Sequence, residues 1–166
     1  MIHVVLYEPE IPQNTGNIMR TCAATGAHLH LIEPLGFSLD IKAVRRSGMD
    51  YISHCDYNVY QNWEEFIEKN PSDHYYYLTR YGKKAPSEFD FTQDKDHYFI
   101  LGKESTGIPL EILRKDKEHC MRLPMKADAR SLNLSNCAAI IVYECLRQLD
   151  YPELSPVEVI KGEDWL

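Results

Sequence analysis

The sequence predicts an α/β fold in which a parallel sheet carries helices on both faces. Two observations predict it: short β-branched and aromatic runs alternate along the chain with capped or amphipathic segments, and no internal repeat interrupts this order. The 166 residues favour a single domain that is large enough to bury its own core. A hydrophobic share of 44% and a charged share of 26% are ordinary for a globular protein.

The first strand and helix are predicted close to the N-terminus. Ile2–Tyr7 is a short run of β-branched and apolar residues, which favours a strand. Two prolines in segment 8–12 break regular hydrogen bonding, so this segment is expected to be a loop. Residues 14–17 offer capping side chains, and a helix is expected from about Asn17 to Thr25. Gly26 suits the left-handed conformation in which many helices end.

The middle of the chain continues the alternation. His28–Ile32 is the second predicted strand, and a short basic helix is expected over residues 40–46. Tyr57–Tyr60 predicts a short third strand. Asn62 is then placed to cap a helix, Trp63–Ile67, whose apolar residues share one face.

The last part of the chain predicts three strands and two helices. The strands are Tyr75–Thr79, Tyr98–Leu101 and Met121–Leu123. Pro109–Arg114 predicts a short helix with proline at a permitted position in the first turn. Asn133–Leu149, rich in Ala, Ile and Leu, predicts the longest helix.

We expect one folded domain over residues 1–151 and a C-terminal tail over residues 152–166. The tail carries two prolines and several acidic residues, so no helix or strand is predicted there. Two alternatives stay open: the tail docks on the domain through Trp165, or it is disordered.

Composition excludes several classes of protein. The five cysteines are odd in number and form no C-x-x-C pair, so neither a disulfide framework nor a zinc site is expected. The longest apolar runs, such as 137–143, are too short to span a bilayer. The N-terminus lacks a basic region before an apolar stretch, which argues against a secretory signal and favours the cytoplasm. The histidines are scattered, and His28 and His30 are expected to be structural.

The net charge of −7 opposes non-specific binding to nucleic acid, because attraction to phosphate requires positive charge. A basic patch on one face can nevertheless coexist with an acidic remainder. The charge therefore leaves an RNA partner open.

Three segments are dense in Gly, Asn, Ser and charged residues: 9–20, 99–109 and 122–136. Each follows or ends a predicted strand, and ligands of open α/β sheets bind beyond the carboxyl ends of strands. Any one segment alone would be ordinary turn and cap chemistry. The sequence contains neither the P-loop pattern G-x-x-x-x-G-K-[ST] nor a G-x-G-x-x-G after the first strand, so nucleotide binding of those kinds is not indicated.

Taken together and in this order, the three segments resemble the three motifs of the SPOUT class of RNA methyltransferases. The resemblance runs from Ile2 to about Tyr151 and is closest to the tRNA ribose 2'-O branch, within it to the small TrmL group. It implies a C-terminal deep trefoil knot through 77–80, 101–109 and 123–133, although chains are generally unknotted. It also implies a homodimer that pairs through the first and last helices, with each active site borrowing residues across the interface.

The resemblance carries candidate catalytic roles to five residues, namely Asn14, Arg20, Glu104, Ser131 and Asn133. Asn14 and Arg20 are expected to face the ribose and phosphate of the RNA. An arginine is almost never deprotonated, so a charged Arg20 is expected to grip the phosphate and stabilise a developing alkoxide. The alternative for Arg20 is an ion pair on a helix surface, and for Glu104 an exposed acidic side chain in a loop.

The resemblance also implies S-adenosylmethionine as the methyl donor, with no metal. Its expected contacts, made largely by backbone groups, are Leu78, Thr79, Gly102, Leu123 and Ser131. Gly102 would let the chain approach the ligand closely, and Leu123 would contact the adenine. Simple core packing is the alternative for both leucines.

The positive surface expected to bind RNA combines motif residues with a cationic helix. Its members are Arg20, Lys42, Arg45, Arg46, Lys103, Lys126 and Arg130. Without this context, a helix carrying several basic residues is more often a solvated face of the protein.

The implied function is transfer of a methyl group to the ribose 2'-hydroxyl of the wobble nucleotide of tRNA, cytidine or uridine 34. Two alternatives stay open. One is 2'-O-methylation at another position of tRNA or of rRNA, and the other is a non-catalytic, knotted dimer that binds RNA.

Overall fold

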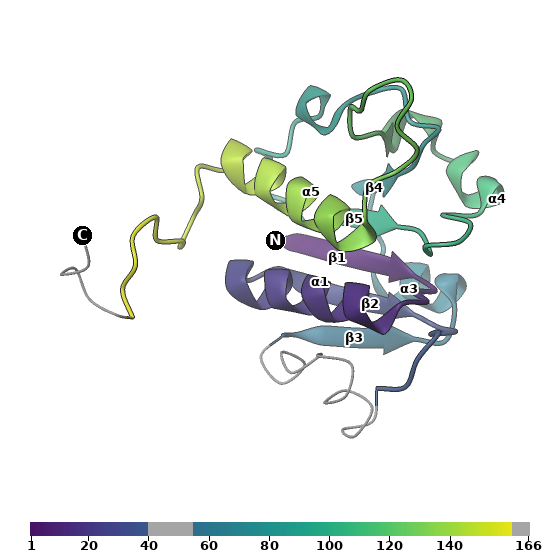
Figure 1. The fold of residues 1–166 in the computed structure, drawn as a ribbon, viewed down its shortest axis with the longest axis horizontal. Helices are drawn as coiled ribbons and strands as arrows, with labels where there is room; N and C mark the ends of the chain where they lie inside the picture. Colours follow the sequence, from purple (N-terminus) through teal and green to yellow (C-terminus); the bar gives the residue numbers. More distant parts are fainter. Residues whose placement is uncertain (40–54, 161–166) are drawn as a thin grey trace.

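The computed structural model describes residues 1–39 and 55–160, which form a six-stranded sheet flanked by helices (Figure 1). The strand order is β3-β2-β1-β5-β4-β6, and every neighbouring pair is parallel. The predicted α/β fold with a parallel sheet is therefore confirmed. The strands are β1 (Ile2–Tyr7), β2 (His28–Ile32), β3 (Tyr57–Tyr60), β4 (Tyr75–Leu78), β5 (His97–Leu101) and β6 (Cys120–Met121).

The helices cover both faces of the sheet. Helices α1 (Pro12–Thr25) and α5 (Leu134–Gln148) lie side by side on one face, and α3 (Trp63–Lys69) lies on the other (Figure 1). The shorter helices are α4 (Leu110–Leu113), η2 (Pro86–Glu88) and η3 (Lys117–His119). No helix within the described ranges combines the length and apolar character needed to cross a membrane.

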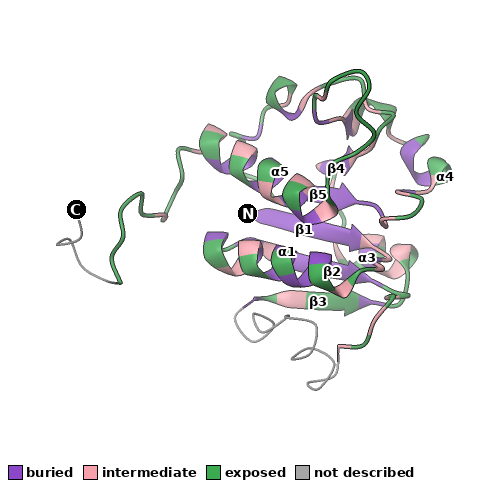
Figure 2. Cartoon of the chain, viewed as in Figure 1, coloured by how far each residue is buried: buried purple, intermediate pink, exposed green. Residues whose placement is uncertain are grey.

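Alternate residues of β1 contribute to two separate cores. Val4 and Leu6 pack in the cluster that includes Ile18 of α1 and Ile141 of α5. Val5 faces the opposite side and joins the cluster of Phe66 from α3. Burial on both faces is typical of parallel sheets and explains why β1 is apolar almost throughout (Figure 2).

The predicted start of the first helix is wrong. Helix α1 begins at Pro12 instead of Asn17, so segment 8–12 is not wholly loop. Proline is compatible with the first helical position because its missing N–H needs no partner there. Asn14, which was expected among the capping residues, is instead buried inside the helix. Gly26 adopts the predicted left-handed conformation at the end of the helix, with φ +72°.

An asparagine side chain caps each of two helices, and of these caps the one at Asn62 was predicted from the sequence. The Asn62 side chain accepts a hydrogen bond from the Glu65 N–H at the start of α3. The Asn133 side chain accepts from the Ser135 and Asn136 N–H groups at the start of α5. Both helices thus begin where a side chain satisfies backbone donors that have no partner within the helix.

Strand ends differ from the predictions by one or two residues. β4 ends at Leu78, one residue early, and β5 begins one residue early, at His97. β6 is Cys120–Met121 instead of Met121–Leu123, because the Arg122 N–H leaves β4 and donates to the carbonyl of Lys84. The predicted basic helix over 40–46 and the predicted docking residue Trp165 lie outside the described residues.

A histidine cluster fills the space near the amino ends of the central strands. Ring nitrogens of His3 and His30 lie 2.9 Å apart, and the second ring nitrogen of His30 lies 2.9 Å from the Tyr60 hydroxyl. The second ring nitrogen of His3 lies 3.4 Å from a carboxylate oxygen of Asp96. Burial lowers the pKa of His3 and lowers the pKa of His30 to about 3. The expectation that His30 is structural agrees with these contacts.

This cluster predicts a loss of stability in acid. The unfolded chain binds a proton at His30 near pH 6.5, whereas the folded chain binds it only near pH 3. The free energy of unfolding should therefore fall as pH falls through this window, by at most about 1.4 kcal/mol per unit of pKa difference. Urea unfolding between pH 7 and pH 4, at fixed protein concentration, measures the slope.

The matched variants are His30→Gln, which keeps hydrogen-bonding groups but does not titrate, and His74→Gln, outside the cluster. His30→Gln should flatten the pH dependence of unfolding, and His74→Gln should leave it steep. Equal slopes in the parent and in His30→Gln would contradict the assignment.

Candidate functional site

The carboxyl ends of four strands lie in register, so the segments that follow them begin side by side. Leu101 of β5 pairs with Leu6 of β1 on one side and with Leu78 of β4 on the other. Leu78 in turn pairs with Met121 of β6. Because parallel strands end at the same edge, all three motif segments of the sequence start or pass there.

Glu104 connects the second motif segment to the first. Its carboxylate accepts hydrogen bonds from the N–H groups of Glu10 and Ile11, at 2.9 and 3.2 Å. It also accepts from the Asn14 amide nitrogen at 3.2 Å. Glu104 is half-buried, so the alternative of a freely exposed loop acid does not apply.

Asn14 connects the first segment to the third. Its amide oxygen accepts from Nδ2 of Asn133 at 3.0 Å, and Asn14 itself is buried. The Asn133 oxygen meanwhile caps α5 and accepts from the Ser135 hydroxyl at 2.6 Å. A continuous chain of hydrogen bonds, Glu104–Asn14–Asn133, therefore joins the three segments at one point; we call it the Glu104–Asn133 chain.

Two contacts beside this chain were not predicted. The Ser105 N–H and hydroxyl donate to the carboxylate of Glu10 at 2.9 and 2.8 Å, and these hydrogen bonds lower the Glu10 pKa. The Lys103 ammonium lies 2.9 Å from the Glu8 carboxylate, whose hydrogen bond raises the pKa of Lys103. Lys103, expected to bind RNA, is thus engaged within the protein. No local pattern marks these partners, which lie 95 residues apart in sequence.

Gly102 is required by a close backbone approach. A Cβ atom at this position would lie 2.2 Å from the carbonyl carbon of Gly107, a distance that no side chain tolerates. Gly107 itself has φ +73°, in the left-handed region that favours glycine. The close approach that requires glycine at position 102 is thus made by the Gly107 backbone of the same loop, and the expected contact of Gly102 with a ligand stays a prediction.

Segment 79–84 is tied to the chain that leaves β6. The Thr79 N–H donates to the Met121 carbonyl at 3.0 Å, and the Arg122 N–H donates to the Lys84 carbonyl at 2.9 Å. A Cβ atom on Gly82 would lie 2.3 Å from the carbonyl carbon of Met121. These contacts lie next to two of the segments expected to form the knot, 77–80 and 123–133, and the knot itself stays a prediction.

The remaining predicted residues are placed as follows. Leu78 and Thr79 are half-buried at the end of β4, and Leu123 is buried in the core, in agreement with its packing alternative. Ser131 is exposed two residues before Asn133, in a stretch without regular structure. Arg130 and Lys126 are also exposed. Lys42, Arg45 and Arg46 lie outside the described residues.

Arg20 lies on the exposed side of α1, away from the turn that holds Asn14. Six residues separate the two, which is about 9 Å along a helix axis. The hydrogen bonds that define the Glu104–Asn133 chain do not involve Arg20.

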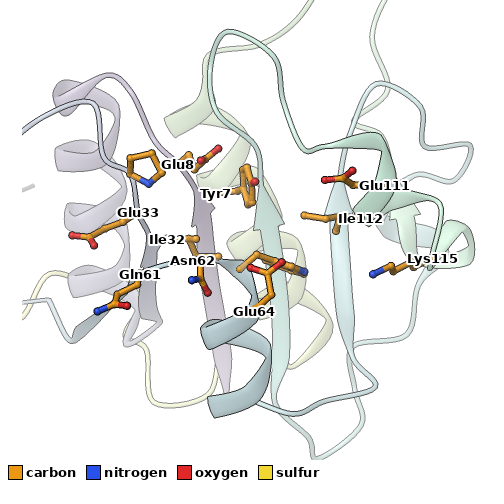
Figure 3. A pocket seen from close by; sticks show the side chains of 12 residues that line it. Tyr7, Glu8, Ile32, Glu33, Gln61, Asn62, Glu64, Glu111, Ile112 and Lys115 are labelled. Carbon is orange, nitrogen blue, oxygen red and sulfur yellow. The ribbon is translucent and has the colours of Figure 1, made fainter.

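Two cavities flank α4, and neither is lined by Gly102, Leu123 or Ser131. The larger, of about 450 Å³, opens beyond β1, β2 and β3 (Figure 3). The carboxylates of Glu8, Glu33, Glu64 and Glu111 line it, with Lys115 as the one cation among its lining residues. Within the described part of the chain, no group of three or more His, Cys, Asp or Glu side chains is arranged to hold a metal ion.

The hydrogen bonds of Glu104 predict a specific loss of stability on neutralisation. Glu104→Gln keeps one oxygen but directs an NH₂ group toward backbone N–H donors. The free energy of unfolding should fall by about 1.5–3 kcal/mol, the usual worth of hydrogen bonds to a charged group. Glu68→Gln on exposed α3 is the control and should change it by less than about 0.5 kcal/mol. Equal urea midpoints for the two variants would refute this role.

Comparisons with known proteins agree with this geometry. The model of the SpoU rRNA Methylase family matches residues 1–143. A Listeria monocytogenes protein, provisionally named tRNA (cytidine(34)-2'-O)-methyltransferase, is 50% identical over 153 residues, 92% of this chain and 90% of the relative. A Saccharophagus degradans protein named tRNA (cytidine(34)-2'-O)-methyltransferase is 44% identical over 152 residues, 91% of this chain and 97% of the relative.

Solved structures of RNA methyltransferases are also similar to this chain. A Bacillus anthracis protein described provisionally as an RNA methyltransferase superposes with a TM-score of 0.90 at 52% identity, covering 96% of this chain and 100% of that one. A structure described as concerning 2-OH methylation of C/U34 on tRNA superposes with a TM-score of 0.80 at 38% identity. The match covers 90% of this chain and 97% of that one. An AdoMet-bound SpoU methyltransferase of Streptomyces viridochromogenes superposes with a TM-score of 0.73 at 26% identity. The match covers 88% of this chain and 57% of that one.

The family model spans most of the chain, and the relatives are far above 30% identity over nearly its whole length. The resemblance of the three motif segments to the SPOUT class is thereby confirmed. The chain belongs to the SpoU methylase family of RNA methyltransferases.

Proposed function

We propose that the protein transfers a methyl group from S-adenosylmethionine to the ribose 2'-hydroxyl of nucleotide 34, cytidine or uridine, of tRNA. The observation that carries the proposal is the Glu104–Asn133 chain, because it unites the three segments that the resemblance assigns to the active site. Relatives that are named for methylation at cytidine 34 support nucleotide 34 as the site of modification. We place the reaction in the cytoplasm, a reducing compartment that suits the free thiols of the five cysteines.

The residues at the sheet edge fit S-adenosylmethionine. Gly102 lets the loop after β5 fold back tightly against Gly107 at the edge of the sheet, where backbone groups are expected to contact the cofactor. Leu78 and Leu123 offer apolar contacts, and Thr79 and Ser131 complete the expected set. When bound, the cofactor supplies a methyl group already activated by a sulfonium, so no metal is needed. An AdoMet complex among the related structures agrees with this choice.

The protein contributes by positioning the reacting groups and by stabilising the charge that develops on the ribose oxygen. Glu104, Asn14 and Asn133 fix the loops relative to one another, which holds the reacting groups in one geometry. Guanidinium groups are protonated in proteins, so the role proposed for Arg20 is to grip the phosphate beside the ribose. The same charge stabilises the alkoxide that develops as the 2'-hydroxyl loses its proton.

A homodimer would bring Arg20 to the site of the partner subunit. Helices α1 and α5 lie side by side, and each exposes a stripe of residues on one face (Figures 1 and 2). The two stripes are Gln13, Asn17, Arg20 and Ala24 on α1 and Asn136, Ile140, Tyr143 and Arg147 on α5. Ile140 and Tyr143 are 44% and 48% exposed, large apolar surfaces that a partner would cover.

The activity is tested by incubating the protein with labelled S-adenosylmethionine and total tRNA and mapping the modified nucleotide. Label should appear on the ribose of nucleotide 34. Arg20→Ala should reduce transfer by at least about a hundredfold, the usual cost of losing one stabilising donor, while the Kd for the cofactor stays unchanged.

Lys69→Ala, which removes an exposed cation paired with Glu65 on α3, is the matched control and should retain transfer. Label on a base would refute the reaction class, and label on another nucleotide would refute the position. Equal turnover by Arg20→Ala would remove Arg20 from the mechanism.

The dimer is tested by placing a charge in the exposed apolar stripe. Tyr143→Glu should shift the molar mass measured by light scattering from two subunits to one, since burying an unpaired carboxylate is costly. The rate of methyl transfer should fall in the same variant. Tyr81→Glu, an exposed tyrosine on another surface, should remain dimeric. A single-subunit mass for the parent protein would reject the dimer outright.

A further inference from the structure

A basic cavity lies beside the edge strand β6, on the opposite side of α4 from the acidic cavity of Figure 3. Its volume is about 350 Å³, and it is formed by the segment after β4 and by the chain from α4 to β6. We call it the basic groove and define it by its charged and aromatic lining: Tyr81, Lys83, Lys84, Arg114, Lys117 and Glu118.

Charge is strongly concentrated in this groove. Four of its lining residues are cations, and the one acid, Glu118, lies 3.2 Å from the Lys84 ammonium. The groove therefore carries an excess of three positive charges in a protein whose net charge is −7. Lys83, Arg114 and Lys117 are exposed, so their charges are available to a ligand.

The two cavities have opposite charge although only α4 separates them. Arg114 faces the basic groove, whereas Glu111 and Lys115 line the acidic cavity with three further glutamates (Figure 3). A polyanion at this end of the molecule is attracted to one side of α4 and repelled from the other.

The groove also offers an aromatic platform. The Tyr81 ring is 52% exposed, and the Arg80 guanidinium lies 4.8 Å from its centre. Nη2 of Arg80 donates to the Tyr81 hydroxyl at 2.9 Å, which steadies the ring. Cations along a groove with an exposed ring are the combination by which proteins bind single-stranded nucleic acid.

The wall of the groove is continuous with the candidate active site. The Lys84 carbonyl accepts from the Arg122 N–H, one residue before Leu123. Lys84 also forms a bridge with Met121, which pairs with Leu78 at the carboxyl edge of the sheet. The groove thus begins beside the edge at which the methyl transfer is proposed.

We propose that the basic groove docks the phosphate backbone of a single-stranded stretch of the tRNA substrate, with one base against Tyr81. This inference rests on the proposed function for the identity of the RNA. It adds Tyr81, Lys83, Arg114 and Lys117 to the RNA-binding surface, none of which belongs to the positive surface expected from the sequence.

The test compares two double variants that lose the same charge. Lys83→Gln with Lys117→Gln removes two of the three excess positive charges of the groove, and Lys69→Gln with Lys95→Gln removes two exposed lysines near the amino ends of β4 and β5. Filter binding gives the Kd for tRNA over a range of salt concentrations. The groove variant should bind about tenfold more weakly, and the slope of log Kd against log salt should fall by about 1.4, since each lost phosphate contact contributes about 0.7.

Tyr81 is tested separately. Tyr81→Ala should weaken tRNA binding about fivefold or more without changing the salt slope, because stacking involves no counterion release. Tyr81→Phe, which keeps the ring, should bind nearly as the parent protein does.

Equal losses in the two lysine pairs, or an unchanged salt slope, would overturn the proposal. So would a changed Kd for S-adenosylhomocysteine in the groove variant, since the groove would then belong to the cofactor site, or an absence of tRNA binding by the parent protein. Binding is measured without catalysis, so a protein that binds tRNA through the groove but transfers no methyl group refutes only the proposed function.

Discussion

The organisation of the site depends on one carboxylate, that of Glu104, which accepts from two backbone N–H groups and from Asn14. The buried part of a carboxylate requires hydrogen-bond donors, and each donor named here belongs to the segment at the start of α1. Through Asn14 the same interaction reaches Asn133, 119 residues further along the chain. The loops can therefore adopt their mutual positions only together, which is the property that an active site assembled from distant segments needs.

The parallel sheet makes this arrangement possible. Every crossover returns the chain to the same starting edge, so the carboxyl ends of β1, β4, β5 and β6 lie in one row. Glycine then permits what side chains would prevent, since Gly102 and Gly82 both approach neighbouring backbone too closely for a Cβ atom. Regular strands set the direction of the loops, and the two glycines set how tightly they pack.

Local patterns predicted the strands well because each is a short apolar run between breakers, and the asparagine cap of α3 followed from the same reasoning. The motif resemblance predicted that Asn14, Glu104 and Asn133 belong to the site, but it did not predict the hydrogen bonds between them. Glu10 and Ser105 were missed because their interaction spans 95 residues and leaves no periodic trace. The start of α1 was misplaced because polar residues suited to capping, such as Asn14, are equally suited to buried hydrogen bonds within a helix.

The acidic balance of the chain and an RNA substrate are compatible because charge is segregated. Sequence alone gives a net charge, whereas binding responds to the local potential, and Arg114 and Glu111 face different cavities although only two residues separate them. Non-specific attraction to RNA is then weak over most of the surface, and phosphates are favoured where cations gather. A basic groove beside an acidic cavity orients a bound polyanion, because the carboxylates across α4 disfavour poses that the cations alone would allow.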